Sequence, residues 1–119
     1  MSETEKMMAA AVQALESKKA EDVKIINIAE ISSIADCFVI ASGTNRNQVQ
    51  AMADAVEETL GKEKIHARSI EGYAAARWIL MDYGDVVFHL FDRESRSFYD
   101  LERIWRDGKN IDPKSLQDS

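Results

Sequence analysis

The sequence of 119 residues contains few of the residues that dominate secreted and low-complexity proteins: one cysteine, one proline and five glycines. The single cysteine, Cys37, excludes an internal disulfide, and its apolar neighbours indicate a small buried side chain rather than a nucleophile or metal ligand. The low proline and glycine content argues against a disordered chain. We therefore expect a protein of a reducing compartment with a hydrophobic core.

An export signal and a long apolar run are also missing. The chain begins with the acidic segment Met-Ser-Glu-Thr-Glu-Lys, which lacks the basic region, apolar stretch and small-residue cleavage pattern of a signal peptide. The sequence therefore predicts a cytoplasmic protein without a membrane segment.

Positive charge is scarce as well. Fifteen basic residues against 21 acidic ones give a formal charge of -6, which repels phosphate backbones and disfavours sequence-specific nucleic-acid binding. The same field attracts a basic protein and speeds its encounter. Acidic side chains also serve solubility alone, so composition leaves both readings open.

Three segments have the apolar spacing of helices. In the first, Ser2 and Glu5 match a capping box ahead of an apolar stripe over residues 7–15. The second covers residues 49–60, with Gly61 expected just beyond its end. In the third, four apolar side chains are expected to share one helical face: Phe98, Leu101, Ile104 and Trp105.

The remaining apolar segments predict strands. Residues 23–28, 37–41 and 65–70 are the first three, and RWILMDYGDVVFHLF at 77–91 predicts a hairpin that turns at Gly84-Asp85. The unit 37–70 should make a right-handed crossover with parallel strands, whereas the link between the first two strands is so short that they should be antiparallel.

These elements predict one α/β domain, a mixed five-stranded sheet flanked by helices. The domain is expected over residues 1–107, followed by a flexible polar tail over residues 108–119. We see no internal repeat and no second domain.

Neither histidine has the surroundings of a metal ligand. His89 lies in a strand between apolar neighbours and is typical of a structural histidine. His66 has no cysteine or histidine at ligand spacing, and a zinc site needs three or four such donors. We therefore predict no metal site and no cofactor.

Three carboxylates at strand ends give an alternative function. Asp36, Asp82 and Asp85 would hold magnesium, with a nucleotide near residues 42–44, in a small nucleotidyl or phosphoryl transferase. However, aspartates are also favoured in turns, and residues 42–44 lack the spaced glycines and the lysine of a P-loop.

The predicted hairpin concentrates side chains that protein interfaces enrich. Tryptophan, tyrosine, methionine and arginine combine a large apolar area with a polar group or an adaptable shape. Alternation along a strand sends neighbouring residues to opposite faces, so some of this set must lie in the core. The residues concerned are Arg77, Trp78, Met81, Asp82 and Tyr83, with Glu71 nearby.

Five blocks of sequence form an ordered pattern over nearly the whole chain: DCFVIASGT at 36–44, QVQAMAD at 48–54, EG at 71–72, WILMDYGDVVFH at 78–89, and FYDLE at 98–102 with Trp105. Together they closely resemble the ribosomal silencing factor family RsfS, also called Iojap-like. The resemblance implies a fold similar to that of nucleotidyltransferases, but without enzymatic activity. Ser42-Gly43 is similar to the signature of such enzymes, whereas residues 65–70 lack their pair of metal-binding carboxylates.

The resemblance also implies a partner and a role. Members of this family bind the large ribosomal subunit through its basic ribosomal protein fourteen, block association with the small subunit and repress translation under nutrient limitation. In this sequence the implied partner-binding residues are Glu71, Arg77, Trp78, Met81, Asp82 and Tyr83. Because an apolar docking strand left uncovered is an aggregation risk, we also expect a homodimer of the free protein.

Overall fold

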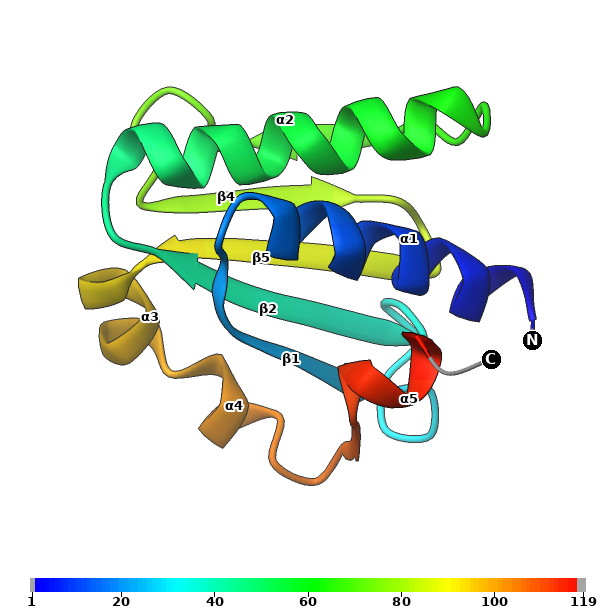
Figure 1. The fold of residues 1–119 in the computed structure, drawn as a ribbon. Helices are drawn as coiled ribbons and strands as arrows, with labels where there is room; N and C mark the ends of the chain where they lie inside the picture. The colour runs from blue at the N-terminus through cyan, green and yellow to red at the C-terminus, as the bar shows by residue number, and fades with distance from the viewer. Residues whose placement is uncertain (1, 118–119) are drawn as a thin grey trace.

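In the computed structural model, which describes residues 2–117, six strands form one mixed sheet in the order β3-β4-β5-β2-β1-β6 (Figure 1). β2 and β5 pair in parallel at the centre, and every other neighbouring pair is antiparallel. The strands are β1 (Glu21–Asn27), β2 (Cys37–Gly43), β3 (Ser69–Glu71), β4 (Trp78–Asp82), β5 (Val86–Asp92) and β6 (Lys109–Ile111).

The two long helices, α1 (Glu3–Ser17) and α2 (Arg46–Lys62), cover one face of the sheet, and the short α5 (Pro113–Gln117) packs beside α1. We call this side the helix-covered face. On the opposite side, called the open face below, α3 (Arg93–Tyr99) and α4 (Leu101–Ile104) pack against the strands. No helix within residues 2–117 has both the length and the apolar run that crossing a membrane requires.

The helix starts follow from their capping residues. Ser2 and Glu5 form the predicted capping box of α1. Asn45 caps α2 by accepting the backbone N–H of Gln48 at 2.8 Å. α2 continues past Gly61, and the left-handed residue beyond its end is Lys64, so the predicted end of this helix was wrong by a few residues.

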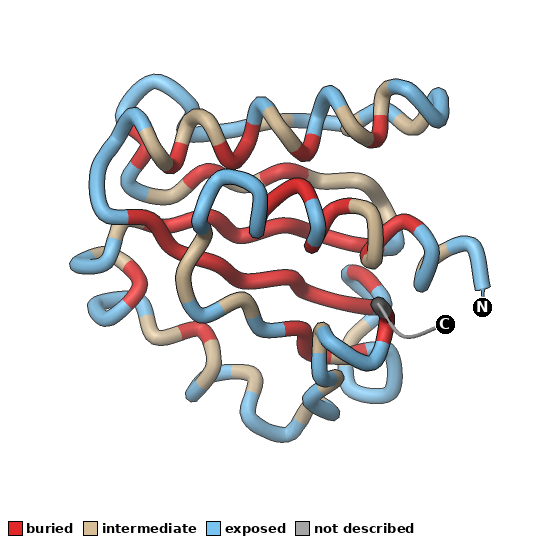
Figure 2. Tube along the Cα trace, in the orientation of Figure 1, coloured by how far each residue is buried: buried red, intermediate tan, exposed pale blue. Residues whose placement is uncertain are grey.

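The centre of the sheet explains the continuously apolar sequences. All seven residues of β2 are buried, as are six of the seven in β5, because both strands have neighbours on each side and packing on each face (Figure 2). The antiparallel pairing of β1 with β2 and the β4–β5 hairpin are confirmed. Gly84, at φ +86°, supplies the positive φ of the hairpin turn.

The sheet has six strands, so the prediction of five was wrong. Within residues 108–117, β6 pairs with β1 as a sixth strand, and α5 buries Leu116 in the core of the helix-covered face. Residues 118–119 lie outside the described residues. This strand has almost no sequence signature because β6 is three residues long and exposes the side chains of Lys109 and Asn110.

Two further elements differ from expectation. The third predicted strand is only Ser69–Glu71 and lies at the sheet edge, parallel to β2 but not next to it. The last predicted helix is broken at Asp100, whose φ of +48° ends α3 and starts α4. Phe98 and Leu101 therefore do not share one buried helical face. The likeness to the nucleotidyltransferase fold stays a prediction.

Candidate docking face

Strand register assembles one row of side chains across the open face. Glu71 on β3 pairs with Leu80 on β4, Leu80 pairs with His89 on β5, and His89 pairs with Ile40 on β2. Directly paired residues of neighbouring strands point to the same face. This middle row therefore continues from a buried centre to an exposed carboxylate at the edge.

Two parallel rows flank it. One row carries Trp78, Phe91 and Ser42 at the end where α3 lies, and the other carries Asp82 and Val87 near the hairpin turn. Alternation is therefore confirmed for Trp78, Leu80 and Asp82, which share the open face and are each half-buried.

The open face is only partly covered, and its aromatic side chains extend to the surface. The ring of Trp78 lies 4.6 Å from that of Tyr99 on α3, and Phe98 lies 5.1 Å from Tyr99. Tyr99 is 42% exposed and Phe98 is 78% exposed. A continuous apolar patch thus leads from the sheet to solvent, which is the usual sign of an interaction site.

His89 fixes the position of the tryptophan. The indole Nε1–H of Trp78 donates to Nδ1 of His89 at 3.1 Å, while His89 itself is only 5% exposed. Burial lowers the pKa of His89 to about 4. At neutral pH the ring is therefore uncharged, and since Nδ1 accepts, the proton is on Nε2. No hydrogen-bond partner of Nε2 is found within residues 2–117.

The loop between β3 and β4 is held against α2. Gln50 donates to the Tyr73 carbonyl at 2.9 Å, and the Tyr73 hydroxyl donates to the Asp54 carboxylate at 2.9 Å. Gly72 sits at φ +80°, where an added Cβ would overlap the Trp78 carbonyl oxygen. These contacts fix the loop that joins the end of β3 at Glu71 to the start of β4 at Trp78.

The six predicted contact residues divide between the two faces. Glu71 and Arg77 are exposed, and Trp78 and Asp82 lie on the open face. Met81 is 0% exposed and belongs to the core under the helices, so we remove it from the candidate contacts.

Tyr83 also packs on the helix-covered side, edge-on to Phe88. Its hydroxyl is buried without a hydrogen-bond partner within residues 2–117, and burial raises its pKa to about 12. The contact residues predicted from the sequence left out other members of the open face, although alternation along β4 already placed one of them on the same face as Trp78 and Asp82. These members are Leu80, His89, Phe98 and Tyr99.

The alternative transferase site is not assembled. Asp36 and Asp85 are neighbours, since the Asp36 N–H donates to the Asp85 carbonyl at 2.8 Å, and the Asp82 carboxylate accepts the Gly84 N–H at 2.8 Å. Residues 42–44 lie at the other end of β2, which has seven residues and a length of roughly 20 Å. No group of three possible metal ligands occurs within residues 2–117.

The proposed phosphate-binding junction is also occupied by the chain itself. Oε1 of Gln48 accepts the Thr44 N–H at 2.6 Å and the Thr44 hydroxyl at 2.9 Å. The amide of Gln48 in turn donates to the carbonyls of Lys18 and Lys19 after α1. Gln48 therefore joins the end of α1 to the start of α2, and the Thr44 N–H is not directed at a ligand.

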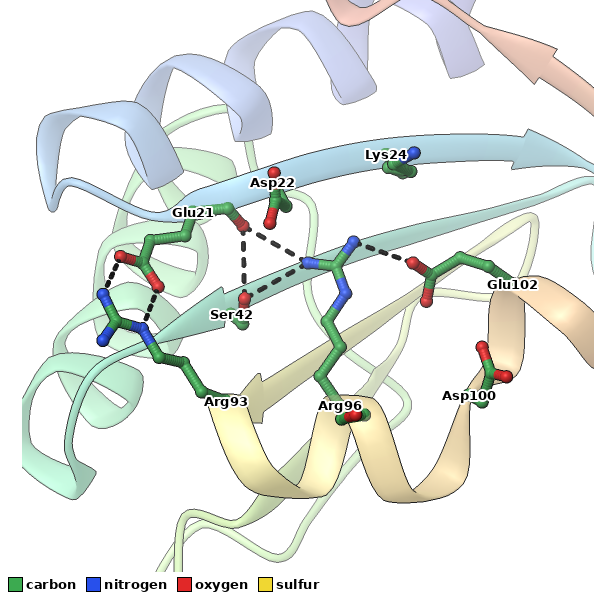
Figure 3. Close-up of a pocket in the computed structure, with 9 residues that line it drawn as sticks. Glu21, Asp22, Lys24, Ser42, Arg93, Arg96, Asp100 and Glu102 are labelled. Atoms are coloured by element: carbon green, nitrogen blue, oxygen red, sulfur yellow. Dashed lines mark hydrogen bonds and ion pairs between the residues drawn. The ribbon is translucent and has the colours of Figure 1, made fainter.

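A charged hollow of about 530 Å³ lies between α3 and the strands β1 and β2, away from Trp78 (Figure 3). Buried Arg96 donates to the Glu21 carbonyl and the Ser42 hydroxyl, both at 3.3 Å, and pairs with Glu102 at 3.1 Å. Arg93 forms a two-point pair with the Glu21 carboxylate, one arm of which measures 2.7 Å. Both arginines are therefore already paired within the chain, and their contacts attach α3 to β1 and β2.

Comparison with known proteins gives an independent line of evidence. The model of the family described as "Ribosomal silencing factor during starvation" matches residues 1–119. The ribosomal silencing factor RsfS of Halalkalibacterium halodurans is 40% identical over 108 residues, covering 91% of this chain and 92% of that protein. RsfS of Zymomonas mobilis is 41% identical over 108 residues, covering 91% and 81%.

A solved structure has the same fold. A crystal structure of a Chromobacterium violaceum protein superposes with a TM-score of 0.84 at 29% identity, covering 94% of this chain and 92% of that one. The ordered sequence blocks, the full-length family match and this superposition agree. The chain belongs to the ribosomal silencing factor family.

Proposed function

We propose that this protein is a ribosomal silencing factor that binds the large ribosomal subunit with its open face. The contact is made with the basic ribosomal protein fourteen on the surface that meets the small subunit, as the family resemblance implies. The observation that carries the proposal is a half-exposed tryptophan and leucine on β4, continuous with exposed aromatics and flanked by acidic residues.

The apolar part of this face supplies the affinity. Trp78 and Leu80 are half-buried in the free protein, so a partner that covers them removes the remaining apolar area from water. A central aromatic anchor of this kind contributes about 2 kcal/mol or more to binding. His89 holds the indole in place beforehand, which reduces the entropy lost on docking.

The charged part supplies orientation. Glu71 lies at the edge of the middle row and Asp82 in the row beside it, so carboxylates flank the apolar centre. Pairs with lysine or arginine of a basic partner at such a rim mainly set the association rate and the orientation. Steric occupation of the joining surface then blocks association of the subunits, which represses translation in the cytoplasm when nutrients are limiting. No covalent step is needed.

Co-sedimentation with purified large subunits tests the proposal. The double variant Glu71→Lys, Leu80→Glu reverses the edge charge and places a charge in the apolar centre, so binding should fall at least about tenfold. Glu58→Lys makes the same charge reversal on the outer surface of α2 and should bind as the unmodified protein does. Circular dichroism checks that each variant is folded. Equal binding by the double variant and the control would refute the proposed contact.

We also propose that two copies of the free protein pair through the open face and that this homodimer competes with ribosome binding. Self-pairing covers the apolar patch that the isolated chain exposes. Sedimentation equilibrium should show a dimer that the Leu80→Glu substitution dissociates. A monomer at high protein concentration would contradict this proposal without affecting the contact with the large subunit.

A further inference from the structure

We infer that the hollow beside Trp78 receives a lysine or arginine side chain of the partner. The inference rests on the proposed function and specifies one part of its contact. The hollow has a volume of about 460 Å³ and lies between the start of β4, the end of β5 and α3. Three aromatic and three charged residues line it: Trp78, Phe98, Tyr99, Arg77, Asp92 and Glu94.

The three aromatic rings of the lining meet at different inclinations. The planes of Trp78 and Tyr99 are inclined by 47° and those of Phe98 and Tyr99 by 87°, while Tyr99 also stacks on buried Phe91 at 29°. Aromatic faces carry negative charge density and attract a cation that lies within about 6 Å of the ring centre. Phe98 is 78% exposed, so its ring is available to a partner side chain.

The fold keeps these rings at the surface. Asp100, at φ +48°, ends α3 directly after Tyr99, so both aromatics belong to the last turn of the helix. Buried Arg96 fixes the same helix from its other side through Ser42 and Glu102. Contacts of Arg96 thus fix the helix that carries Phe98, and Phe98 is exposed on an anchored helix.

Charge selects a cation over an anion. Asp92 and Glu94 place two carboxylates in the lining against the one guanidinium of Arg77. One oxygen of Asp92 accepts the Ser95 N–H at 2.8 Å as the cap of α3, and Glu94 is exposed and forms no ion pair within residues 2–117. With a formal charge of -6 on the whole chain, the local and the overall field both favour a basic side chain.

The first test uses the free protein and a short probe. The peptide acetyl-Gly-Arg-Gly-amide is titrated into labelled protein by NMR, next to the same peptide with uncharged citrulline in place of arginine. We expect the Trp78 indole N–H resonance to shift with the arginine peptide only. Glu94→Gln and Phe98→Ala should each weaken this binding about threefold. Glu58→Gln, an equal charge change on α2, should leave it unaltered.

Arg77→Gln should change the affinity for the arginine peptide in the opposite direction to Glu94→Gln. Removing the one cation from the lining should strengthen binding of the arginine peptide. If Arg77→Gln weakens binding while Glu94→Gln strengthens it, the hollow takes an anion and the inference is overturned. Equal shifts with the arginine and citrulline peptides would overturn it as well.

The second test separates this inference from the proposed function. Glu94→Gln and Phe98→Ala should lower affinity for purified large subunits about tenfold when combined. If the combined variant binds subunits as the unmodified protein does, the hollow is not part of the contact, while the proposed function stands. If the unmodified protein itself does not bind, the proposed function fails, and the peptide titration still decides whether the hollow selects a cation.

Discussion

A neutral histidine supports the aromatic anchor of the open face. His89 accepts the indole N–H of Trp78 through Nδ1, and an imidazolium could not do so because both of its nitrogens are donors. The ring is buried among apolar neighbours, and its edge-to-face contact with Phe38 has a centroid distance of 4.5 Å. Protonation of His89 therefore opposes both folding and the fixed position of Trp78.

The stability of the protein should consequently fall on acidification. The pKa of His89 is about 4 in the folded protein and near 6.5 when unfolded, so between these values the unfolded state binds the extra proton. The free energy of unfolding should then decrease by up to about 1.4 kcal/mol per pH unit as the pH is lowered through this window. Urea unfolding at pH 5, 6 and 7 measures the slope.

Two substitutions test whether His89 causes this dependence of stability on pH. His89→Phe removes the titrating group and should flatten the dependence between pH 5 and 7, whatever its effect on absolute stability. His66→Gln changes the other histidine and should retain the slope. A slope that survives in the His89→Phe protein would show that other groups cause the acid sensitivity.

Gly72 is a second single-residue requirement. Its φ of +80° and the approach of the Trp78 carbonyl oxygen leave no room for a side chain, so Gly72→Ala should destabilise the protein by about 2 kcal/mol. Gly61→Ala is the matched substitution, because Gly61 lies inside α2 with nothing near its Cβ position. That change should stabilise by about 0.5–1 kcal/mol. Thermal unfolding of the two proteins compares them; similar effects would contradict the steric argument.

At the scale of elements, α3 is fastened by two arginines of unequal importance. Arg96 is buried and joins the Glu21 carbonyl, Ser42 and Glu102, so Arg96→Gln should cost about 3 kcal/mol. Arg93 forms its two-point pair with Glu21 largely in solvent, and Arg93→Gln should cost less than about 1 kcal/mol. Denaturant midpoints measure both. Equal losses would mean that burial does not decide the strength of these pairs.

The C-terminal element is part of the fold and should behave accordingly. Leu116 buries its side chain among the residues under α1, so Leu116→Ala should destabilise by about 2–3 kcal/mol. Lys114, two residues earlier on α5, is exposed, and Lys114→Ala should change stability by no more than about 0.5 kcal/mol. Equal thermal midpoints for the two variants would show that α5 does not contribute to the core.

At the scale of the whole molecule, net charge and the open face act together. The formal charge of -6 should steer the protein to a basic partner, so the association rate with large subunits should fall about tenfold as salt rises from about 50 to 300 mM. In the proposed complex apolar contacts supply most of the affinity, so the dissociation rate should change less. Stopped-flow measurement over this salt range checks both; an association rate that does not depend on salt would contradict steering.

Patterns in the sequence were enough to predict the central elements and the family. Continuous apolar runs predicted β2 and β5 because those strands are covered on both faces, and the turn residues between the apolar runs predicted the β4–β5 hairpin. The capping box and periodicity predicted α1. These signals are local, because each depends on residues that follow one another within a single short segment of the chain. The ordered blocks extend over nearly the whole chain and indicated the RsfS family, and the family match confirmed that resemblance.

Which hairpin residues are available to a partner depends on how the whole chain packs. Alternation separated Trp78 from Met81 but did not tell which face the long helices cover, because that depends on the handedness of the α2 crossover and on where α1 packs. The pairing of β6 with β1 and the grouping of Phe98 and Tyr99 beside Trp78 join residues at least 20 positions apart. Such contacts are set by the packing of the whole chain and have no local signature.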